Sequence, residues 1–396
     1  MKGFAPTIAA AVLVMAAAAC AHAPRVVSQP PQELDVAAGM RGLESNPRLR
    51  ARLLGGPHGY FRFINPAFSR AVCRRFRDVA DAQPPVTLHG DAHVEQYTIT
   101  DLGRGLTDFD DSSQGPAEMD IVRLGVSLRL AAIERGWPGA GEVALAAFLR
   151  AYRATLLNPT TEAPVPALVA RVRAGFEQSR AACLARNEAL METLQEGPPP
   201  ADEATMVQAV RTLAANSSLP ESFFSKKKGG ALRIGIGSAL AEKYLVRVEG
   251  PTTADDDDVL LEVKQVRDPT GVDCVRSAPG PSRIFVGQAR IAYEPFRFPG
   301  VFHVGDKTFW IHAWPDNYAE VDIRRTLESP RDLEEIAYDV GVQLGRGHPA
   351  GLSAAAKLRS EVLKTLPEAR IEQVVAELSA DTVQAWERFR SSPPPS

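Results

Sequence analysis

Cysteine is scarce in this chain: only four occur among 396 residues. None belongs to a Cys-x-x-Cys pair or to a cysteine–histidine spacing typical of a zinc site. If Cys20 is modified at the N-terminus, three cysteines remain, so at most one disulfide can form. We expect Cys73, Cys183 and Cys274 to be small, buried apolar residues instead.

The chain also lacks a charge imbalance and a long hydrophobic run. Its formal net charge is −3, from 45 basic and 48 acidic side chains, so the charge gives no indication of nucleic-acid binding. Beyond the N-terminal segment, no apolar stretch approaches the ~20 residues that cross a bilayer. Hydrophobic residues make up 45% and charged residues 23%, as in an ordinary globular protein. We therefore expect a folded protein without an integral membrane domain.

The N-terminus is predicted to be a targeting segment. Ala9–Ala19 is an apolar run of signal-peptide length, and Cys20 follows it directly. This pattern resembles a bacterial lipoprotein signal, in which the cysteine becomes the lipidated first residue. We expect a signal peptide over 1–20, a Pro-rich tether over 21–40, and an exported protein of the cell envelope or periplasm that is attached to the membrane only through a lipid anchor on Cys20. Ordinary secretion, with cleavage three residues after Cys20, remains the alternative.

The hydrophobic pattern divides the rest of the chain into three segments. A helical period dominates 41–225, a period closer to two dominates 226–320, and the helical period returns over 321–390. The predicted fold class is therefore α+β. Strands are expected at Pro85–Leu88, Ala231–Ile236, Ala241–Val248, Val259–Val266, His303–Val304 and Lys307–Ala313. Helices are expected at Leu34–Leu54, Pro66–Ala82, Met119–Arg135, Val143–Leu157, Val165–Glu196, Asp202–Ala215, Asp332–Arg346 and Ile371–Arg390.

Two acidic loops carry the most informative pattern. His-Gly-Asp-Ala-His at 89–93 follows the first expected strand, and Asp-Phe-Asp at 108–110 begins seventeen residues after Asp91. Phosphoryl-transfer enzymes use two such carboxylates, one to accept the proton of an attacking hydroxyl and one to hold a divalent metal. Asp91 is the candidate general base, and His89 beside it is expected to orient the loop. His93 is expected to be a hydrogen-bonded structural residue.

The candidate metal ligands are Asp108, Gln96 through its amide oxygen, and Asp110 as a second carboxylate. Oxygen donors of this kind suit magnesium or manganese. Asp120 is expected either to cap the helix that follows or to be a buried partner of the catalytic loop.

A candidate phosphate-binding pattern lies in the β-rich segment. Gly235, Gly237 and Ser238 form a glycine turn after a strand, where backbone N–H groups can approach phosphates closely. Lys264 follows on a largely apolar strand, 27 residues after Gly237. A glycine turn, a hairpin and then a strand lysine is the order found in the nucleotide-holding lobe of kinases.

These motifs together resemble the bacterial domain-of-unknown-function family 2252, over about residues 50–350. That family is grouped with the protein-kinase-like superfamily, beside the aminoglycoside phosphotransferases. The blocks that carry the resemblance are His-Gly-Asp-x-His at 89–93, Asp-Phe-Asp at 108–110, Asp-Ile-Val-Arg-Leu at 120–124, Gly-Ile-Gly-Ser at 235–238, Val-Lys at 263–264, Gly-Gln at 287–288 and Gly-Val-Gln-Leu-Gly-Arg-Gly-His at 341–348.

The resemblance implies a protein-kinase-like two-lobe fold that binds ATP and Mg²⁺. In ordinary kinases the glycine loop and the strand lysine precede the catalytic loop, whereas here they follow it. The implied fold is therefore circularly permuted. A helical lobe with the catalytic loop comes first at 41–225, a glycine-loop β lobe follows at 226–320, and helices at 321–390 complete the helical lobe.

Two positions depart from the family pattern. Gln96 stands where the family has Asn, which would move a metal ligand by roughly 1 Å. Val286 stands where we expect the Glu that would pair with the strand lysine.

Three hypotheses remain open. The first is a phosphotransferase that moves a phosphoryl group from a nucleoside triphosphate to a hydroxyl of a small molecule or a protein. The second is a catalytically degenerate kinase-like fold that serves as an envelope binding or scaffold lipoprotein. The third is a metal-dependent hydrolase that uses His89, Asp91 and His93.

Overall fold

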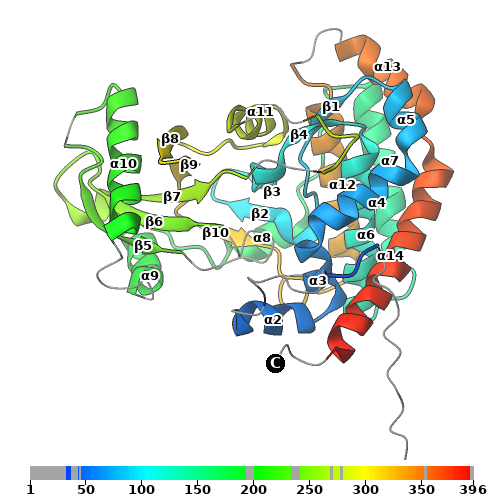
Figure 1. The fold of residues 1–396 in the computed structure, drawn as a ribbon, viewed down its shortest axis with the longest axis horizontal. Coiled ribbons are helices and arrows are strands. Elements are labelled where there is room, and N and C mark those ends of the chain that lie inside the picture. Colours follow the sequence, from blue (N-terminus) through cyan, green and yellow to red (C-terminus); the bar gives the residue numbers. More distant parts are fainter. Residues whose placement is uncertain are drawn as a thin grey trace, which may run out of the picture. The chain divides into compact units, whose positions relative to one another are not determined.

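The computed structural model describes residues 33–36, 43, 46–192, 200–220, 222–232, 241–267, 271–276, 280–351 and 355–392. The expected signal peptide, nearly all of the tether, and Gly235, Gly237 and Ser238 lie outside these residues. The part from Glu33 to the C-terminus forms one compact unit. It mixes helices with short antiparallel sheets, which confirms the α+β class (Figure 1). No helix in the described ranges is both long and apolar enough to cross a membrane.

Among the described elements, four short helices come first. They are α2 (Pro47–Leu54), α3 (Pro57–Phe63), α4 (Asn65–Arg75) and α5 (Arg77–Ala82). A proline stands at one of the first two positions of α2, α3 and α4, where its missing N–H costs no helical bond. The helix predicted over Pro66–Ala82 is broken at Phe76, whose φ of −126° and ψ of 24° leave the helical region.

Two helices from opposite ends of the chain form the centre of the helical part. α7 (Ala140–Leu157) lies beside α12 (Pro330–Gly347), as Figure 1 shows. Gly341 permits the contact, because a Cβ there would lie 2.5 Å from the carbonyl oxygen of Phe148. Around this pair lie α6 (Glu118–Arg135), α8 (Ala167–Arg173), α13 (Ala355–Thr365) and α14 (Glu368–Ser391).

A five-stranded antiparallel sheet forms the β-rich segment. Its strand order is β5–β6–β7–β9–β8. The strands are β5 (Lys226–Ala231), β6 (Lys243–Val248), β7 (Val259–Gln265), β8 (Gly300–Val304) and β9 (Lys307–Ala313). Alternating apolar side chains of β6, β7 and β9 pack against α10 (Pro200–Asn216), which follows α9 (Arg180–Glu192). α11 (Ser282–Ile291) lies between β7 and β8 in the sequence.

Two small sheets hold the acidic loops. β1 (Val86–Leu88) pairs with β4 (Ser113–Gly115), and β2 (Tyr97–Thr100) lies between β3 (Arg104–Leu106) and β10 (Tyr318–Glu320). Of the strand expected at Ala231–Ile236, only Ala231 lies in a described strand, as the last residue of β5 (Lys226–Ala231), and residues 233–236 lie outside the described ranges. The later strand predictions agree with β6, β7, β8 and β9 to within a few residues.

The expectation for the cysteines is corrected at two positions. Cys73 of α4 and Cys274 form a disulfide, with Cα atoms 5.7 Å apart and a sequence separation of 201 residues. An isolated β-bridge between Gln114 and Arg276 brings the second cysteine close to α4. No local pattern could reveal this pairing, because the bridge that creates it is a long-range contact. Cys183 is buried and free, as expected.

Candidate active site

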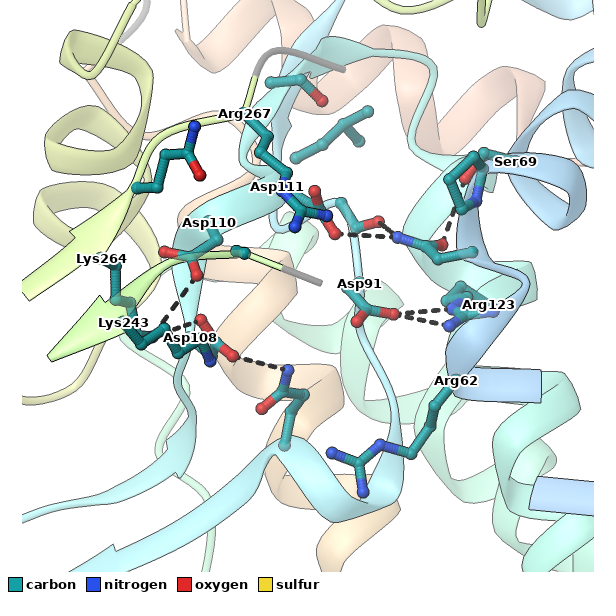
Figure 2. Close-up of a pocket in the computed structure, with 18 of the residues that line it drawn as sticks. Arg62, Ser69, Asp91, Asp108, Asp110, Asp111, Arg123, Lys243, Lys264 and Arg267 are labelled. Atoms are coloured by element: carbon teal, nitrogen blue, oxygen red, sulfur yellow. Dashed lines mark hydrogen bonds and ion pairs between the residues drawn. The ribbon is translucent and has the colours of Figure 1, made fainter. Parts of the chain in front are cut away.

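One cavity of about 370 Å³ collects most of the predicted site residues. Asp91, Gln96, Asp108, Asp110 and Lys264 all line it. Figure 2 shows the carboxylates of the Asp108–Asp111 loop beside the lysines of the five-stranded sheet, with Asp91 and Arg123 on the other side. The cavity therefore lies where the β-rich segment meets the two acidic loops.

Asp120 anchors the loop that carries Asp91. Its Oδ2 accepts the backbone N–H of His89 at 2.6 Å, and its Oδ1 accepts that of Gly90 at 2.9 Å. His348 donates to the same carboxylate at 3.1 Å. Burial alone would raise the pKa of Asp120, but the hydrogen bond from His348 and those from the backbone hold it below its usual value. Asp120 is thus a buried partner of the loop and not a helix cap, since α6 already begins at Glu118.

His89 orients the loop from behind the cavity, which it does not line. Its Nε2 donates to the carbonyl of Thr107 at 2.8 Å, and its Nδ1 accepts the N–H of Asp91 at 3.2 Å. Burial lowers the pKa of His89, so the ring is neutral. With both nitrogens engaged, His89 has no free position for proton transfer.

Gly90 lets the two acidic loops approach each other closely. It has a φ of +87°, and a Cβ there would lie 2.0 Å from the carbonyl oxygen of Asp111.

Asp91 forms a buried ion pair with Arg123. Oδ1 of Asp91 accepts from Nε at 3.0 Å and from Nη2 at 2.7 Å. The guanidinium also stacks on Phe61, 3.6 Å from the ring centroid. Burial raises the pKa of Asp91 although Arg123 acts in the opposite direction. The second oxygen, Oδ2, carries no hydrogen bond in the described part of the chain, so one oxygen is fixed and the other can accept a proton.

His93 differs from the hydrogen-bonded residue that we expected. It is fully buried, and neither ring nitrogen has a hydrogen-bond partner. Nε2 lies 3.6 Å from Oδ2 of Asp91, and burial lowers the pKa of the ring strongly. Among the described residues, no group of three or more His, Cys, Asp or Glu side chains is arranged to hold a metal. The hydrolase hypothesis therefore gains no support from the geometry of His89, Asp91 and His93.

Asp108 begins the second acidic loop in a left-handed conformation, with a φ of +62°. Such a backbone is uncommon for residues other than glycine and often marks functional loops. Its Oδ1 lies 2.9 Å from Nζ of Lys264, and its Oδ2 lies 3.4 Å from the amide nitrogen of Gln96. Burial opposes ionisation, but the charges of Lys264 and Lys243 hold the pKa of Asp108 far below its usual value.

The next two carboxylates of the loop are held differently. Oδ1 of Asp110 accepts the indole N–H of Trp310 at 2.9 Å, and Oδ2 lies 3.4 Å from Nζ of Lys264. Burial and the charge of Asp108 raise the pKa of Asp110. Asp111 accepts a hydrogen bond from Asn65, and burial raises its pKa to about 6. The loop therefore mixes one firmly ionised carboxylate with two that bind protons more readily.

Lys264 extends from β7, where its Cα faces Lys243 on one neighbouring strand and Trp310 on the other. Its ammonium also lies 3.8 Å from Oε2 of Glu262. Burial acts against the charge, but the three carboxylates raise the pKa of Lys264 well above its usual value. Glu262 keeps its charge too: burial is outweighed by Lys264 and His312, which hold its pKa at about 2.

Helix α11 packs against the second acidic loop. Arg283 donates to the carbonyl oxygens of Asp110 and Ser112. Gly287 faces the same loop, and a Cβ there would lie 2.2 Å from Oγ of Ser112. No acidic residue occurs in α11, so this helix offers Lys264 no carboxylate.

Several residues of the site were not found from the sequence. Lys243, Asp111, Asn65 and Arg123 line the cavity together with the predicted residues. Asp111 adjoins the Asp-Phe-Asp motif, and Arg123 lies in a block that we quoted only for the resemblance. The remaining two had no local signal, because long-range packing alone brings them to the cavity.

The comparison with protein families agrees with the first half of this site. The family model described as an uncharacterized protein conserved in bacteria (DUF2252) matches residues 46–219. This match confirms the resemblance over the matched segment. The matched residues include Asp91, Gln96, Asp108 and Asp110. No curated protein and no solved structure matches the chain.

Proposed function

We propose that this protein is a kinase-like phosphotransferase that moves a phosphoryl group from a nucleoside triphosphate to a hydroxyl acceptor. The observation that carries the proposal is the meeting of Lys264 with Asp108 in a cavity that Asp91 also lines. A strand lysine, a metal-binding carboxylate and a carboxylate base are the recurring parts of kinase sites.

The topology supports a kinase-like arrangement. In kinases the lysine lies on the third strand of the nucleotide lobe, after the glycine loop, and the helix αC provides its neighbour. Lys264 lies on β7, the third strand of the five-stranded sheet in both chain order and sheet order. The expected glycine turn falls between the first two strands, and α11 follows the third.

A second relationship supports circular permutation. α12, near the C-terminus, ends where His348 binds Asp120, the anchor of the catalytic loop. The carbonyl of His348 also accepts the N–H of Thr87 in β1. The helix that would feed the catalytic loop in an unpermuted kinase thus contacts that loop although it comes later in the chain.

In the proposed reaction Asp91 accepts the proton of the acceptor hydroxyl. The hydroxyl oxygen then bonds to the terminal phosphorus, and the bond from that phosphorus to the bridging oxygen breaks, which releases a nucleoside diphosphate. The ion pair with Arg123 fixes Asp91, and Oδ2 is the oxygen that takes the proton. Since the pKa of Asp91 is raised by burial, turnover falls as the pH is lowered through that pKa.

The donor set fits magnesium held jointly by protein and nucleotide. Asp108 and Asp110 present carboxylate oxygens. Gln96 can present its amide oxygen as well, because a flip of its amide group would place Oε1 toward Asp108. Magnesium commonly binds one or two carboxylates together with substrate phosphates and waters. When bound, the ion would neutralise charge on the transferred phosphoryl group.

A specific observation favours the degenerate-fold alternative as the second candidate. Lys264 has no helix glutamate as a partner and instead binds the carboxylate that would hold the metal. If this ion pair persisted with nucleotide present, the fold would serve as a binding or scaffold protein in the envelope. The Cys73–Cys274 disulfide supports export in either case, because disulfides persist in oxidising compartments.

Transfer of the terminal phosphoryl group tests the proposal. The purified protein is incubated with γ-labelled ATP, magnesium or manganese, and pooled polyols, amino sugars and hydroxyl-bearing peptides. We expect labelled product from the wild type and a loss of at least about 100-fold in Asp91→Asn, with nucleotide affinity unchanged. Nucleotide binding without transfer to any acceptor, in both proteins, would favour the scaffold alternative.

A further inference from the structure

Lys243 is a buried cation of the cavity that the sequence motifs do not include. It begins β6, and its Cα is paired with that of Lys264 on β7. Only 7% of the residue is exposed, yet it lines the cavity. Figure 2 shows Lys243 and Lys264 side by side, next to Asp108 and Asp110 and away from Arg123.

Lys243 differs from Lys264 in its partners. Lys264 binds Asp108 and lies close to Asp110 and Glu262. Lys243 forms no hydrogen bond or ion pair with any residue in the described part of the chain, although its charge acts on Asp108. The side chain is largely buried and lines the cavity, so the acceptor for its ammonium must come from the cavity, and an anionic ligand can supply it.

The carboxylates around Lys264 weaken its attraction for a phosphate. The negative charges of Asp108, Asp110 and Glu262 offset the positive potential of its ammonium. The positive potential available to an anion therefore comes from Lys243, which is buried, and from Arg267, which is exposed. Arg62 also lines the cavity, but its guanidinium is already bound to Glu95 at 2.7 Å.

We infer that Lys243 binds a phosphoryl oxygen of the ligand and that the cavity takes a di- or triphosphate, with Lys243 as the buried phosphate-binding cation and Lys264 as the residue that positions Asp108. This inference rests on the proposed phosphotransferase function for the identity of the ligand, but the preference for an anionic group follows from the uncompensated ammonium itself.

A purely structural role for Lys243 makes the opposite prediction for metal. If Lys243 only balanced the charge of Asp108, Asp110 and Glu262, its removal would leave those carboxylates more negative. Manganese alone would then bind more tightly, and phosphate-bearing ligands would lose nothing. The phosphate-binding role instead predicts a loss that grows with the number of phosphates.

The test compares Lys243→Met with Lys243→Arg, which keeps the charge, and with the control Lys307→Met. Lys307 lies on β9 of the same sheet, pairs with Glu242 and does not line the cavity. Calorimetric titrations use ATP, AMP and inorganic tripolyphosphate, each with magnesium, and manganese alone. We expect Lys243→Met to weaken ATP and tripolyphosphate on the order of tenfold or more and AMP far less. Lys243→Arg should retain most of the affinity, and Lys307→Met should match the wild type.

The outcomes separate the two proposals. If the wild type binds ATP and Lys243→Met binds it equally well, the inference on Lys243 is wrong and the phosphotransferase proposal stands. If the wild type binds tripolyphosphate but not ATP, and Lys243→Met loses it, the anion role of Lys243 stands and the nucleotide proposal is overturned. If the wild type binds neither ligand, both are overturned.

Discussion

Nζ of Lys264 lies 2.9 Å from Oδ1 of Asp108, although 156 residues separate the two in the chain. This ion pair joins the five-stranded sheet to the second acidic loop. It places a lysine ammonium and the carboxylate that we propose as a metal ligand at one wall of a cavity whose other wall carries Asp91. The proposed chemistry depends on this juxtaposition.

The Asp91–Arg123 pair should be a strong determinant of stability. Arg123→Met leaves the Asp91 carboxylate buried without its partner, so we expect a loss of about 3–5 kcal/mol in the free energy of unfolding. The double variant Arg123→Met/Asp91→Asn removes both charges and should recover much of that loss. Urea denaturation of the wild type, of Arg123→Met, of Asp91→Asn and of the double variant measures the difference. A double variant that loses the sum of the two single effects would contradict the account.

Glu118 should make stability depend on pH. It is fully buried, neither carboxyl oxygen has a hydrogen-bond partner, and burial raises its pKa from 4.5 to about 7. Because the folded pKa exceeds the unfolded one, the contribution of Glu118 to stability is complete below about pH 4.5 and is lost as the pH rises through about 7. We expect Glu118→Gln to be more stable than the wild type at about pH 8.5, by roughly 2–3 kcal/mol, and similar to it near pH 4.5.

Denaturant unfolding at the two pH values checks this prediction. Glu372→Gln, at an exposed position of α14, is the matched control and should show no pH-dependent gain. An equal effect of Glu118→Gln at both pH values would mean that Glu118 keeps its charge in the folded protein.

Gly287 should control the position of the second acidic loop. Alanine there would bring a Cβ to 2.2 Å from Oγ of Ser112, so the loop must shift. We expect Gly287→Ala to lower stability by about 1–3 kcal/mol and to weaken metal-dependent nucleotide binding. Ser112→Gly should relieve much of the effect in the double variant. Gly175→Ala, where the new Cβ meets only an ordinary contact at 3.6 Å, is the control. Identical behaviour of the two alanine variants would refute the prediction.

The sequence predicted the elements of the site better than its contacts. The strand lysine, the two acidic loops and the strands β6, β7 and β9 follow local patterns of period and turn, which one sequence contains. Lys243 and Asn65 were missed because their role comes from residues distant in the chain. The disulfide of Cys73 was missed for the same reason. His93 was misjudged because the sequence does not reveal whether a buried ring has a hydrogen-bond partner.

The most direct test of the proposed function is a thermal-shift titration of the purified protein with ATP, GTP and ADP, with and without magnesium or manganese. A ligand at ~100 times its dissociation constant adds about 2.7 kcal/mol of stability. We predict a metal-dependent rise in melting temperature that Asp108→Ala abolishes and that Asp306→Ala, in the turn between β8 and β9, retains. A flat response of the wild type to every nucleotide and metal combination would contradict the account.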